Sequence, residues 1–252
     1  MLIKGADDKQ PQIEALEALL GRPDVDAQTR RRIEQEIRMI PAGASGERDA
    51  GYEIEFHYGQ SRNRVTIHDL RIELDGRVAQ IDHLIINRLL DIWVCESKQF
   101  AKGVVINEHG KWVAFSGRRA YGIPSPVEQD LRHIAVLGDV FAKGLVALPK
   151  RFGITINPQM KSLVLVSNQA RISRPKGRTA QRVEGLDTVI KVDQLRATIE
   201  RAFDQRSVAA LGKVVSQGTL ETLADSWPRS TCPRASTTPS PPHATSRLVG
   251  SV

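Results

Sequence analysis

The chain is poor in cysteine and lacks any long apolar run. Its 252 residues include two cysteines, Cys95 and Cys232, which stand 137 positions apart. Two cysteines cannot build a disulfide framework or a four-ligand zinc site. No stretch approaches roughly 18 consecutive apolar residues, so the sequence predicts no membrane span and no membrane partner. The stretch MLIKGADDKQPQ also carries acids where a signal peptide needs an apolar core, and we therefore expect a reducing, cytoplasmic location.

Positive charge exceeds negative charge, and the excess is concentrated in one part of the chain. The sequence has 36 Lys and Arg against 29 Asp and Glu, a formal net charge of +7. Residues 143–213 alone hold 14 Lys and Arg against 5 Asp and Glu. Such an excess favours association with polyanions such as nucleic-acid backbones. With 40% hydrophobic and 26% charged residues, the composition is that of a globular chain of one domain or one and a half.

The first part of the chain has helical periodicity. Apolar residues recur at helical spacing in two runs, and Asp26 can cap the second of them. Pro41-Ala42-Gly43 is expected to end this second helix, which makes residues 1–43 a helical hairpin. A third helix is expected from 44 to about 57, and it places Glu47 on a face that also carries apolar residues.

Strands dominate the middle of the chain, and helices follow. Asp75-Gly76 is a strong hairpin signal between two alternating runs, and a turn around His109-Gly110 marks a second hairpin. A helix is expected after Pro126, where an apolar stripe begins. The expected strands are 65–74, 78–87, 91–100, 104–106, 112–115 and 163–166, and a last helix is expected over 192–203. This mixture predicts an α/β fold.

Three chemically active side chains lie in two neighbouring expected strands. Asp82 lies in the first, and the fragment Glu96-Ser97-Lys98 begins fourteen residues later in the second. Side chains alternate along a strand, so Glu96 and Lys98 point to one face. Antiparallel pairing of the two strands would set Asp82 beside Glu96. His83 and Cys95 would face away and pack in the interior.

Two carboxylates and an ammonium at one point indicate a metal site. Adjacent acids repel, and burying either of them unpaired costs several kcal/mol or forces protonation. Mg²⁺ or Mn²⁺ would remove this repulsion, since Mg²⁺ commonly takes one or two carboxylates together with substrate phosphate oxygens. Lys98 would favour hydroxide at a metal-bound water or stabilise charge on the phosphate. Glu47 would add a further carboxylate or orient a water.

A structural interpretation of the same residues stays open at this point. Glu96 and Lys98 alone make a common fragment, which would form a buried ion pair between strands, with Asp82 only ending its strand. The spacing of Asp82 from this fragment, at the end of an apolar strand and behind a helical glutamate, favours a functional site.

In this combination the sequence resembles the nuclease-related domain (NERD) family. The resemblance covers about residues 44–140. The family commonly has Asn-Pro where this chain has Ser125-Pro126, and Asn where it has Gln99, but neither position is an expected metal ligand. The matching segments are Gly46-Glu47, Gln80-Ile81-Asp82-His83, Glu96-Ser97-Lys98 and Ser125-Pro126-Val127-Glu128-Gln129.

The resemblance implies a fold, an activity and a set of site residues. The family belongs to the PD-(D/E)XK, restriction-endonuclease-like superfamily, which implies a central mixed β-sheet flanked by helices. It also implies a Mg²⁺-dependent endonuclease or phosphodiesterase that acts on nucleic acid, with DNA expected. Asp82 and Glu96 would bind the metal, and Lys98 would activate or position the attacking water. Glu47 would assist from its helix, and Gln129 would line the site.

The remaining expectations concern the basic segment and the domain limits. Nucleic-acid contacts are expected from a turn-rich stretch, through Arg171, Arg174, Lys176, Arg178 and Arg182. The expected parts are a helical hairpin over 1–43, the nuclease-related domain over 44–145, the rest of the α/β domain over 146–225, and a disordered tail rich in Ser, Thr and Pro over 226–252. The alternative function is a module that binds nucleic acid without cutting it, and the oligomeric state stays open.

Overall fold

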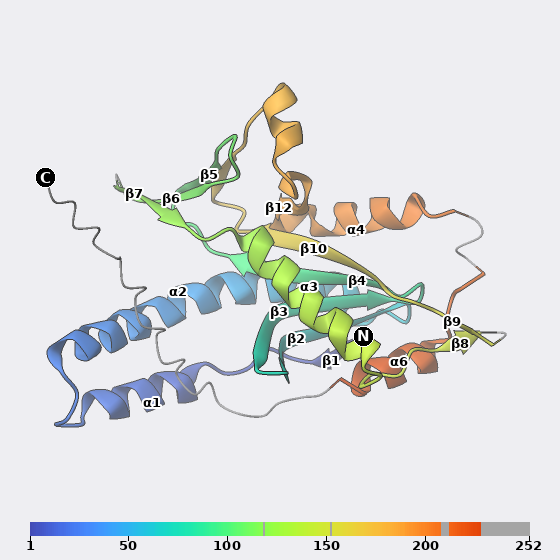
Figure 1. Ribbon diagram of the computed structural model, residues 1–252, viewed down its shortest axis with the longest axis horizontal. Helices are drawn as coiled ribbons and strands as arrows, with labels where there is room; N and C mark the ends of the chain where they lie inside the picture. The colour runs from blue at the N-terminus through green and yellow to red at the C-terminus, as the bar shows by residue number, and fades with distance from the viewer. Residues whose placement is uncertain (118, 152, 208–211, 228–252) are drawn as a thin grey trace, which may run out of the picture.

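A six-stranded mixed sheet forms the centre of the molecule (Figure 1). The structure is a computed structural model that describes residues 1–117, 119–151, 153–207 and 212–227. In sheet order the strands are β1 (Leu2–Lys4), β2 (Arg64–Leu74), β3 (Arg77–Asn87), β4 (Asp91–Lys98), β10 (Gln159–Val166) and β12 (Val189–Lys191). The β2, β3 and β4 strands pair antiparallel, whereas β1 with β2, β4 with β10, and β10 with β12 pair parallel. The expected α/β class with a mixed sheet is confirmed.

Helices cover both faces of this sheet and complete a three-layer arrangement (Figure 1). The helices are α1 (Gln10–Leu20), α2 (Ala27–Tyr58), α3 (Pro126–Ala142), α4 (Leu195–Asp204) and α6 (Gln217–Asp225). On one face, Leu137 of α3 shares a core with Leu84 of β3 and with residues of α6. On the other face, Ile54 of α2 shares a core with Trp93 of β4 and with residues of α4. The central strands are apolar on both sides, which explains their nearly continuous hydrophobic runs. No helix in the described ranges is long and apolar enough to cross a membrane.

A second, smaller sheet projects beyond the end of β4 (Figure 1). In sheet order it contains β11 (Arg171–Ser173), β5 (Gly103–Ile106), β6 (Trp112–Ser116) and β7 (Arg119–Ile123). The expected hairpin around His109-Gly110 is confirmed as β5 and β6. Gly103, with φ of 147°, lets β11 approach, because a Cβ there would lie 2.3 Å from the Arg171 carbonyl oxygen. A two-stranded ribbon, β8 (Lys150–Arg151) with β9 (Ile154–Thr155), and the 3₁₀ segments η1 (Gly177–Arg182), η2 (Leu186–Thr188) and η3 (Val192–Gln194) complete the elements.

The expected helix end at Pro41-Ala42-Gly43 is wrong, because α2 runs without interruption from Ala27 to Tyr58. Its start is as expected, since the Asp26 side chain accepts hydrogen bonds from the backbone N–H groups of Gln28 and Thr29. Pro41 removes one backbone hydrogen bond, but burial of Ile33 before it and Ile54 after it holds both halves of the helix in place. The second helix of the expected hairpin and the third expected helix are therefore one continuous helix.

Other elements were not expected. β1 pairs with β2 and α6 packs on β1 and β2, which are distant in the chain, whereas β7 forms a tight hairpin with the preceding strand β6. After α6, Trp227 is buried and its ring lies 5.2 Å from the ring of Phe141. The packed chain thus extends into the expected disordered tail, whose residues 228–252, including Cys232, lie outside the described residues. The last expected helix begins at Leu195 instead of residue 192, with Gln194 at its N-cap position.

Candidate active site

The strand register brings the two expected metal-binding carboxylates together. In the β3–β4 pair, His83 lies opposite Cys95, and Asp82 and Glu96 are the next residues beyond this pair, close enough for their charges to interact. The backbone N–H of Ser97 donates a 2.8 Å hydrogen bond to Asp82 Oδ2. Both carboxylates are buried, with 9% of Asp82 and 3% of Glu96 exposed. The expectation that pairing would set these two acids side by side is therefore confirmed.

An irregularity in the sheet turns Asp82 toward β4. Ile81 and Leu84 belong to the same core although they are three positions apart, so the alternation of β3 is broken between them. On the neighbouring strand, Asp69 has a φ of 49° and interrupts the β2–β3 pairing at the same level. A non-glycine residue in this conformation is strained and is typical of functional sites.

Lys98 is fixed by two neighbours on different elements. Its Nζ lies 2.5 Å from Glu96 Oε1 and 3.3 Å from the Oε1 of Gln129. Gln129 is on the first turn of α3, which begins where Ser125 accepts a 3.2 Å hydrogen bond from the N–H of Glu128. Pro126 in this first turn is preorganised for a helix start. The structure thus brings together Lys98, Glu96 and Gln129 as the sequence predicts.

Glu47 reaches the site because α2 approaches the end of β4 closely. A Cβ on Gly46 would lie 3.0 Å from the Cβ of Gln99, so only a glycine fits here without displacement. Glu47 Oε2 lies 3.1 Å from Nζ of Lys9, which also lies 2.8 Å from Asp69 Oδ1. Lys9 was not expected at the site, and no local pattern indicates it, because it comes from the segment between β1 and α1.

Burial and mutual repulsion perturb both carboxylates. Burial raises the pKa of Asp82 well above its ordinary range, and the charges of Glu96 and Glu47 add to the rise. Burial also raises the pKa of Glu96, against the opposing charge of Lys98. Perturbed, buried carboxylates at the end of a sheet are a common property of catalytic and metal sites.

Two further residues of α3 border the site, and the sequence interpretation missed both. Asp130 is fully buried, and its Oδ2 accepts a 3.1 Å hydrogen bond from the N–H of Leu163. His133 Nδ1 lies 3.9 Å from Glu96 Oε2. Burial lowers the pKa of His133 to about 4, so the ring is neutral near pH 7 and this approach is no ion pair. The spacing of His133 four residues after Gln129, on one helix face, was the available signal.

A buried hydrogen-bonded chain supports Asp82 from behind. His83 Nδ1 lies 2.7 Å from the Nδ1 of His68, and His83 Nε2 lies 2.9 Å from Ser97 Oγ. On the far side, His68 Nε2 is 3.4 Å from Glu55 Oε1, which favours an N–H at that nitrogen. His83 then donates through Nδ1 and accepts from the Ser97 hydroxyl through Nε2. The expected packing of His83 in the interior is confirmed, as is that of Cys95.

The donor set at Asp82 and Glu96 fits a hard divalent cation. Glu96 Oε2 and His133 Nδ1 are buried and have no hydrogen-bond partner in the described part of the chain. In those same residues, no three His, Cys, Asp or Glu side chains cluster as ready ligands. Mg²⁺ is commonly bound by one or two carboxylates together with waters and phosphate oxygens, whereas Ca²⁺ takes six to eight oxygens.

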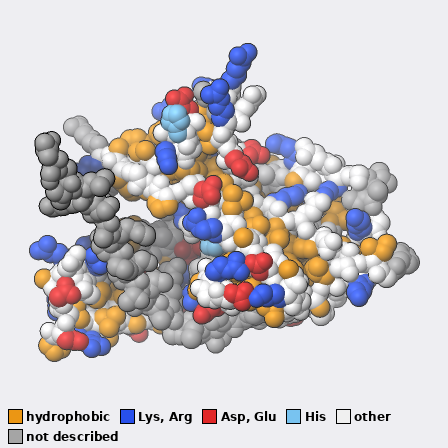
Figure 2. All heavy atoms as spheres, viewed as in Figure 1, with side chains coloured by type: hydrophobic (Ala, Val, Ile, Leu, Met, Phe, Trp, Pro, Cys, Tyr) orange, Lys and Arg blue, Asp and Glu red, His pale blue; other side chains and the backbone are white. Residues whose placement is uncertain are grey.

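The basic segment is divided between surface and structural positions. Arg171 in β11 and both Arg178 and Arg182 in η1 are exposed. Arg174 instead donates a hydrogen bond to the backbone carbonyl of Val189, which ties this segment to β12. Lys176 is exposed between these positions. Figure 2 shows Lys and Arg side chains at the top of the view, over the projecting η1 segment, with acidic side chains nearby.

The mixed sheet, its flanking helices and the carboxylates with Lys98 at the end of β4 define a nuclease-like α/β protein. Residues 42–166 match the model of a family described as the nuclease-related domain, NERD. This part of the chain belongs to that family, and its function is nuclease-related. No curated protein and no solved structure matches the chain.

Proposed function

We propose that the protein is a nuclease of the PD-(D/E)XK type that hydrolyses phosphodiester bonds in DNA with Mg²⁺ or Mn²⁺. One observation carries the proposal. Asp82 and Glu96 lie directly beyond the last residue pair of two neighbouring strands and are both buried, and their charges interact. Lys98 donates hydrogen bonds to Glu96 and Gln129. Paired buried acids beside a lysine suit a phosphoryl-transfer site better than a structural ion pair, because one cation cannot neutralise both acids.

Asp82 and Glu96 are the residues that would hold the metal. A bound Mg²⁺ would act as a Lewis acid on the phosphate oxygens and supply positive charge to the transition state. The Ser97 N–H orients Asp82 for this task, and Glu96 precedes Ser97 on the same strand.

Lys98 and Gln129 act on the substrate side. The short contact with Glu96 directs the Lys98 ammonium toward the carboxylates, where the phosphate would lie. Fixed positive charge at that point stabilises negative charge as it develops on the phosphate. Gln129 limits the rotation of Lys98 from the α3 side. Glu47, once separated from Lys9, would orient the attacking water.

A plasmid nicking assay with Mg²⁺ tests catalysis. Asp82→Ala and Lys98→Ala should each lower the rate by about 10²–10³, as expected for loss of an electrostatic group in a transition state. Lys143→Ala is a matched control, since this lysine pairs with Asp75 on the exposed surface. Equal nicking by wild type and both site variants would refute the catalytic role.

One contact favours the alternative, a module that binds nucleic acid without cutting it. The ammonium of Lys9 forms an ion pair with Glu47, so this lysine already neutralises part of the acidic charge at the site. Calorimetry with Mn²⁺ separates the two functions. A nuclease should bind the metal, and Glu96→Gln should abolish the heat of binding. A non-catalytic module should show no metal binding, yet its DNA affinity should fall steeply with salt.

A further inference from the structure

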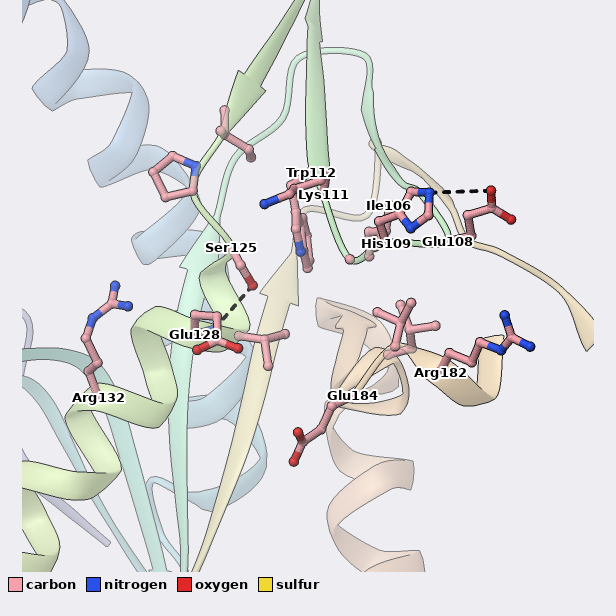
Figure 3. Close-up of a pocket in the computed structure, with 17 residues that line it drawn as sticks. Ile106, Glu108, His109, Lys111, Trp112, Ser125, Glu128, Arg132, Arg182 and Glu184 are labelled. Atoms are coloured by element: carbon pink, nitrogen blue, oxygen red, sulfur yellow. Dashed lines mark hydrogen bonds and ion pairs between the residues drawn. The ribbon is translucent and has the colours of Figure 1, made fainter. Parts of the chain in front are cut away.

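A cleft of about 850 Å³ lies at the start of α3, the helix that carries Gln129 (Figure 3). Three segments that are distant in sequence form its walls, namely the β5–β6 hairpin, the first turns of α3, and the η1–η2 segment. The α3 helix connects the cleft with the active site. Glu128 lines the cleft, and the next residue, Gln129, accepts a hydrogen bond from Lys98. The first turn of α3 therefore contributes one residue to the cleft and the next to the surroundings of Lys98.

Charges of both signs line this cleft, and most of them do not pair with one another. The exposed Asp, Glu, Lys and Arg side chains on its three walls are Glu108, Lys111, Glu128, Arg132, Arg182 and Glu184. Glu108 Oε1 lies 3.7 Å from Nε2 of His109, which also lines the cleft, whereas the other five side chains have no hydrogen-bond or ion-pair partner within the described ranges. Elsewhere on the surface opposite charges do pair, as Arg77 does with Asp139 at 2.7 Å. The cleft thus offers free cationic donors and free carboxylate acceptors around one space.

The positions of these charges suit a ligand that is itself mixed in character. Arg132 and Arg182 stand on opposite sides of the cleft, and Glu128 and Glu184 lie between them (Figure 3). Between the charges, apolar surface comes from Ile123 and from residues of the η1–η2 segment. A ligand that fits would carry negative groups, hydrogen-bond donors and an apolar face.

We propose, on the basis of the nuclease function proposed above, that this cleft binds an unpaired nucleotide of the substrate strand next to the scissile phosphate. Arg132, Arg182 and Lys111 would contact phosphates, and the carboxylates of Glu128 and Glu184 would accept hydrogen bonds from amino and imino groups of the base. In a duplex these base edges are already paired, and the outward phosphates would be repelled by the two carboxylates. The cleft therefore selects single-stranded or splayed DNA over a continuous duplex.

Binding without cleavage tests this proposal. The full chain is titrated in EDTA against three fluorescent probes of eight nucleotides, which are a single strand, the same strand in a duplex, and a single strand of abasic sugars. The abasic probe keeps every phosphate and lacks every base. We expect the normal single strand to bind about tenfold tighter than either other probe, a factor within the range of base contacts in single-strand binding proteins.

Two double variants then separate the cations from the carboxylates. Arg132→Gln with Arg182→Gln should weaken binding of every probe, because phosphate contacts are lost. Glu128→Ala with Glu184→Ala should remove the difference between the normal and abasic strands. Arg201→Gln and Glu17→Ala are the matched controls, since both side chains are exposed, on α4 and α1. They should leave all three affinities unchanged.

The outcomes of this experiment distinguish failure of the cleft proposal from failure of the proposed nuclease function. Equal affinity for the normal and abasic strands, or tighter duplex binding, overturns the cleft proposal even if the protein nicks DNA. Tighter binding of all probes by the carboxylate variant also overturns it, because the carboxylates would then only repel phosphates. If wild type prefers the normal strand and the carboxylate variant loses this preference, the cleft proposal is supported, even if wild type fails to nick DNA.

Discussion

At the residue scale, Gly46 sets the distance between α2 and the end of β4. A Cβ at this position would meet Gln99 at 3.0 Å, whereas a Cβ at Gly43 in the same helix would meet nothing within 4 Å. Gly46→Ala gains about 1 kcal/mol in helix propensity and loses about 1–3 kcal/mol to overpacking. We therefore expect a net loss of about 0–2 kcal/mol in stability and a lower nicking rate, because Glu47 is displaced.

Gly43→Ala is the control for this prediction, and it should raise the free energy of unfolding by about 0.5–1 kcal/mol without affecting nicking. Urea unfolding and plasmid nicking measure the two properties separately. An unchanged nicking rate in Gly46→Ala would show that the position of Glu47 does not matter.

Asp130 makes stability depend on pH. Burial raises the pKa of Asp130 to about 8, so the folded state binds this proton more tightly than the unfolded state does. The contribution of Asp130 to stability is complete below pH 4 and is lost as the pH rises toward 8, by at most about 1.4 kcal/mol per pH unit. Asp82 and Glu96 act in the same direction.

Asp130→Asn keeps an oxygen acceptor for the Leu163 N–H and removes the ionisation. We expect this variant to be more stable than wild type at pH 8 and to lose less stability between pH 5 and pH 8. Urea midpoints at the two pH values measure the effect. The control Asp49→Asn, at an exposed position, should have the same urea midpoint as wild type at both pH values. If Asp130→Asn loses as much stability as wild type between pH 5 and pH 8, the raised pKa of Asp130 is contradicted.

At the element scale, Pro41 lies inside α2, where a proline costs about 3 kcal/mol. Pro41→Ala should restore the backbone donor and raise the free energy of unfolding by about 1–3 kcal/mol in urea denaturation. Pro11, in the first turn of α1, is the matched control, because a proline there removes no helical hydrogen bond. Equal effects of Pro11→Ala and Pro41→Ala would contradict this account.

Pro41 also shows what the sequence pattern could and could not predict. Local rules located Asp26 as a cap and Asp75-Gly76 as a turn, because such signals act within a few residues. A proline normally ends a helix, but here buried residues on both sides of Pro41 outweigh its local cost. Strand β1 could not be predicted, because its three residues gain their structure only by pairing with β2.

For the candidate site too, local patterns predicted some features and tertiary packing decided others. Alternation along the strands and a single hairpin sufficed to predict that Asp82, Glu96 and Lys98 converge. Lys9 joins them from the segment before α1, which no spacing encodes. His133 follows Gln129 by four residues on α3, and this spacing was the one signal for it. The metal-binding and catalytic roles of these residues stay predictions until the assays above are done.

At the scale of the whole molecule, Trp227 joins the last described helix to the main core. Its ring packs edge-on against Phe141, and its Nε1 is buried without a hydrogen-bond partner among the described residues. Trp227→Ala should lower the free energy of unfolding by about 3–5 kcal/mol. Trp227→Phe should cost much less, since it keeps an aromatic contact and removes the unpaired N–H. Thermal denaturation compares them, and a loss under about 1 kcal/mol in Trp227→Ala would contradict a core role.

The sheet order has a consequence for the time at which the site forms. Strand β4 pairs with β3 through a short turn, but its other neighbour is β10, where Asp91 lies opposite Gln159, 68 positions later. Local pairs form quickly, whereas parallel pairs with large sequence separation form slowly. During synthesis Asp82 and Glu96 can thus meet before α3 has delivered Gln129 to Lys98. In a newly synthesised chain, Asp82 and Glu96 would come together first and Lys98 would be oriented last. Any nuclease activity would therefore begin only when folding is nearly complete.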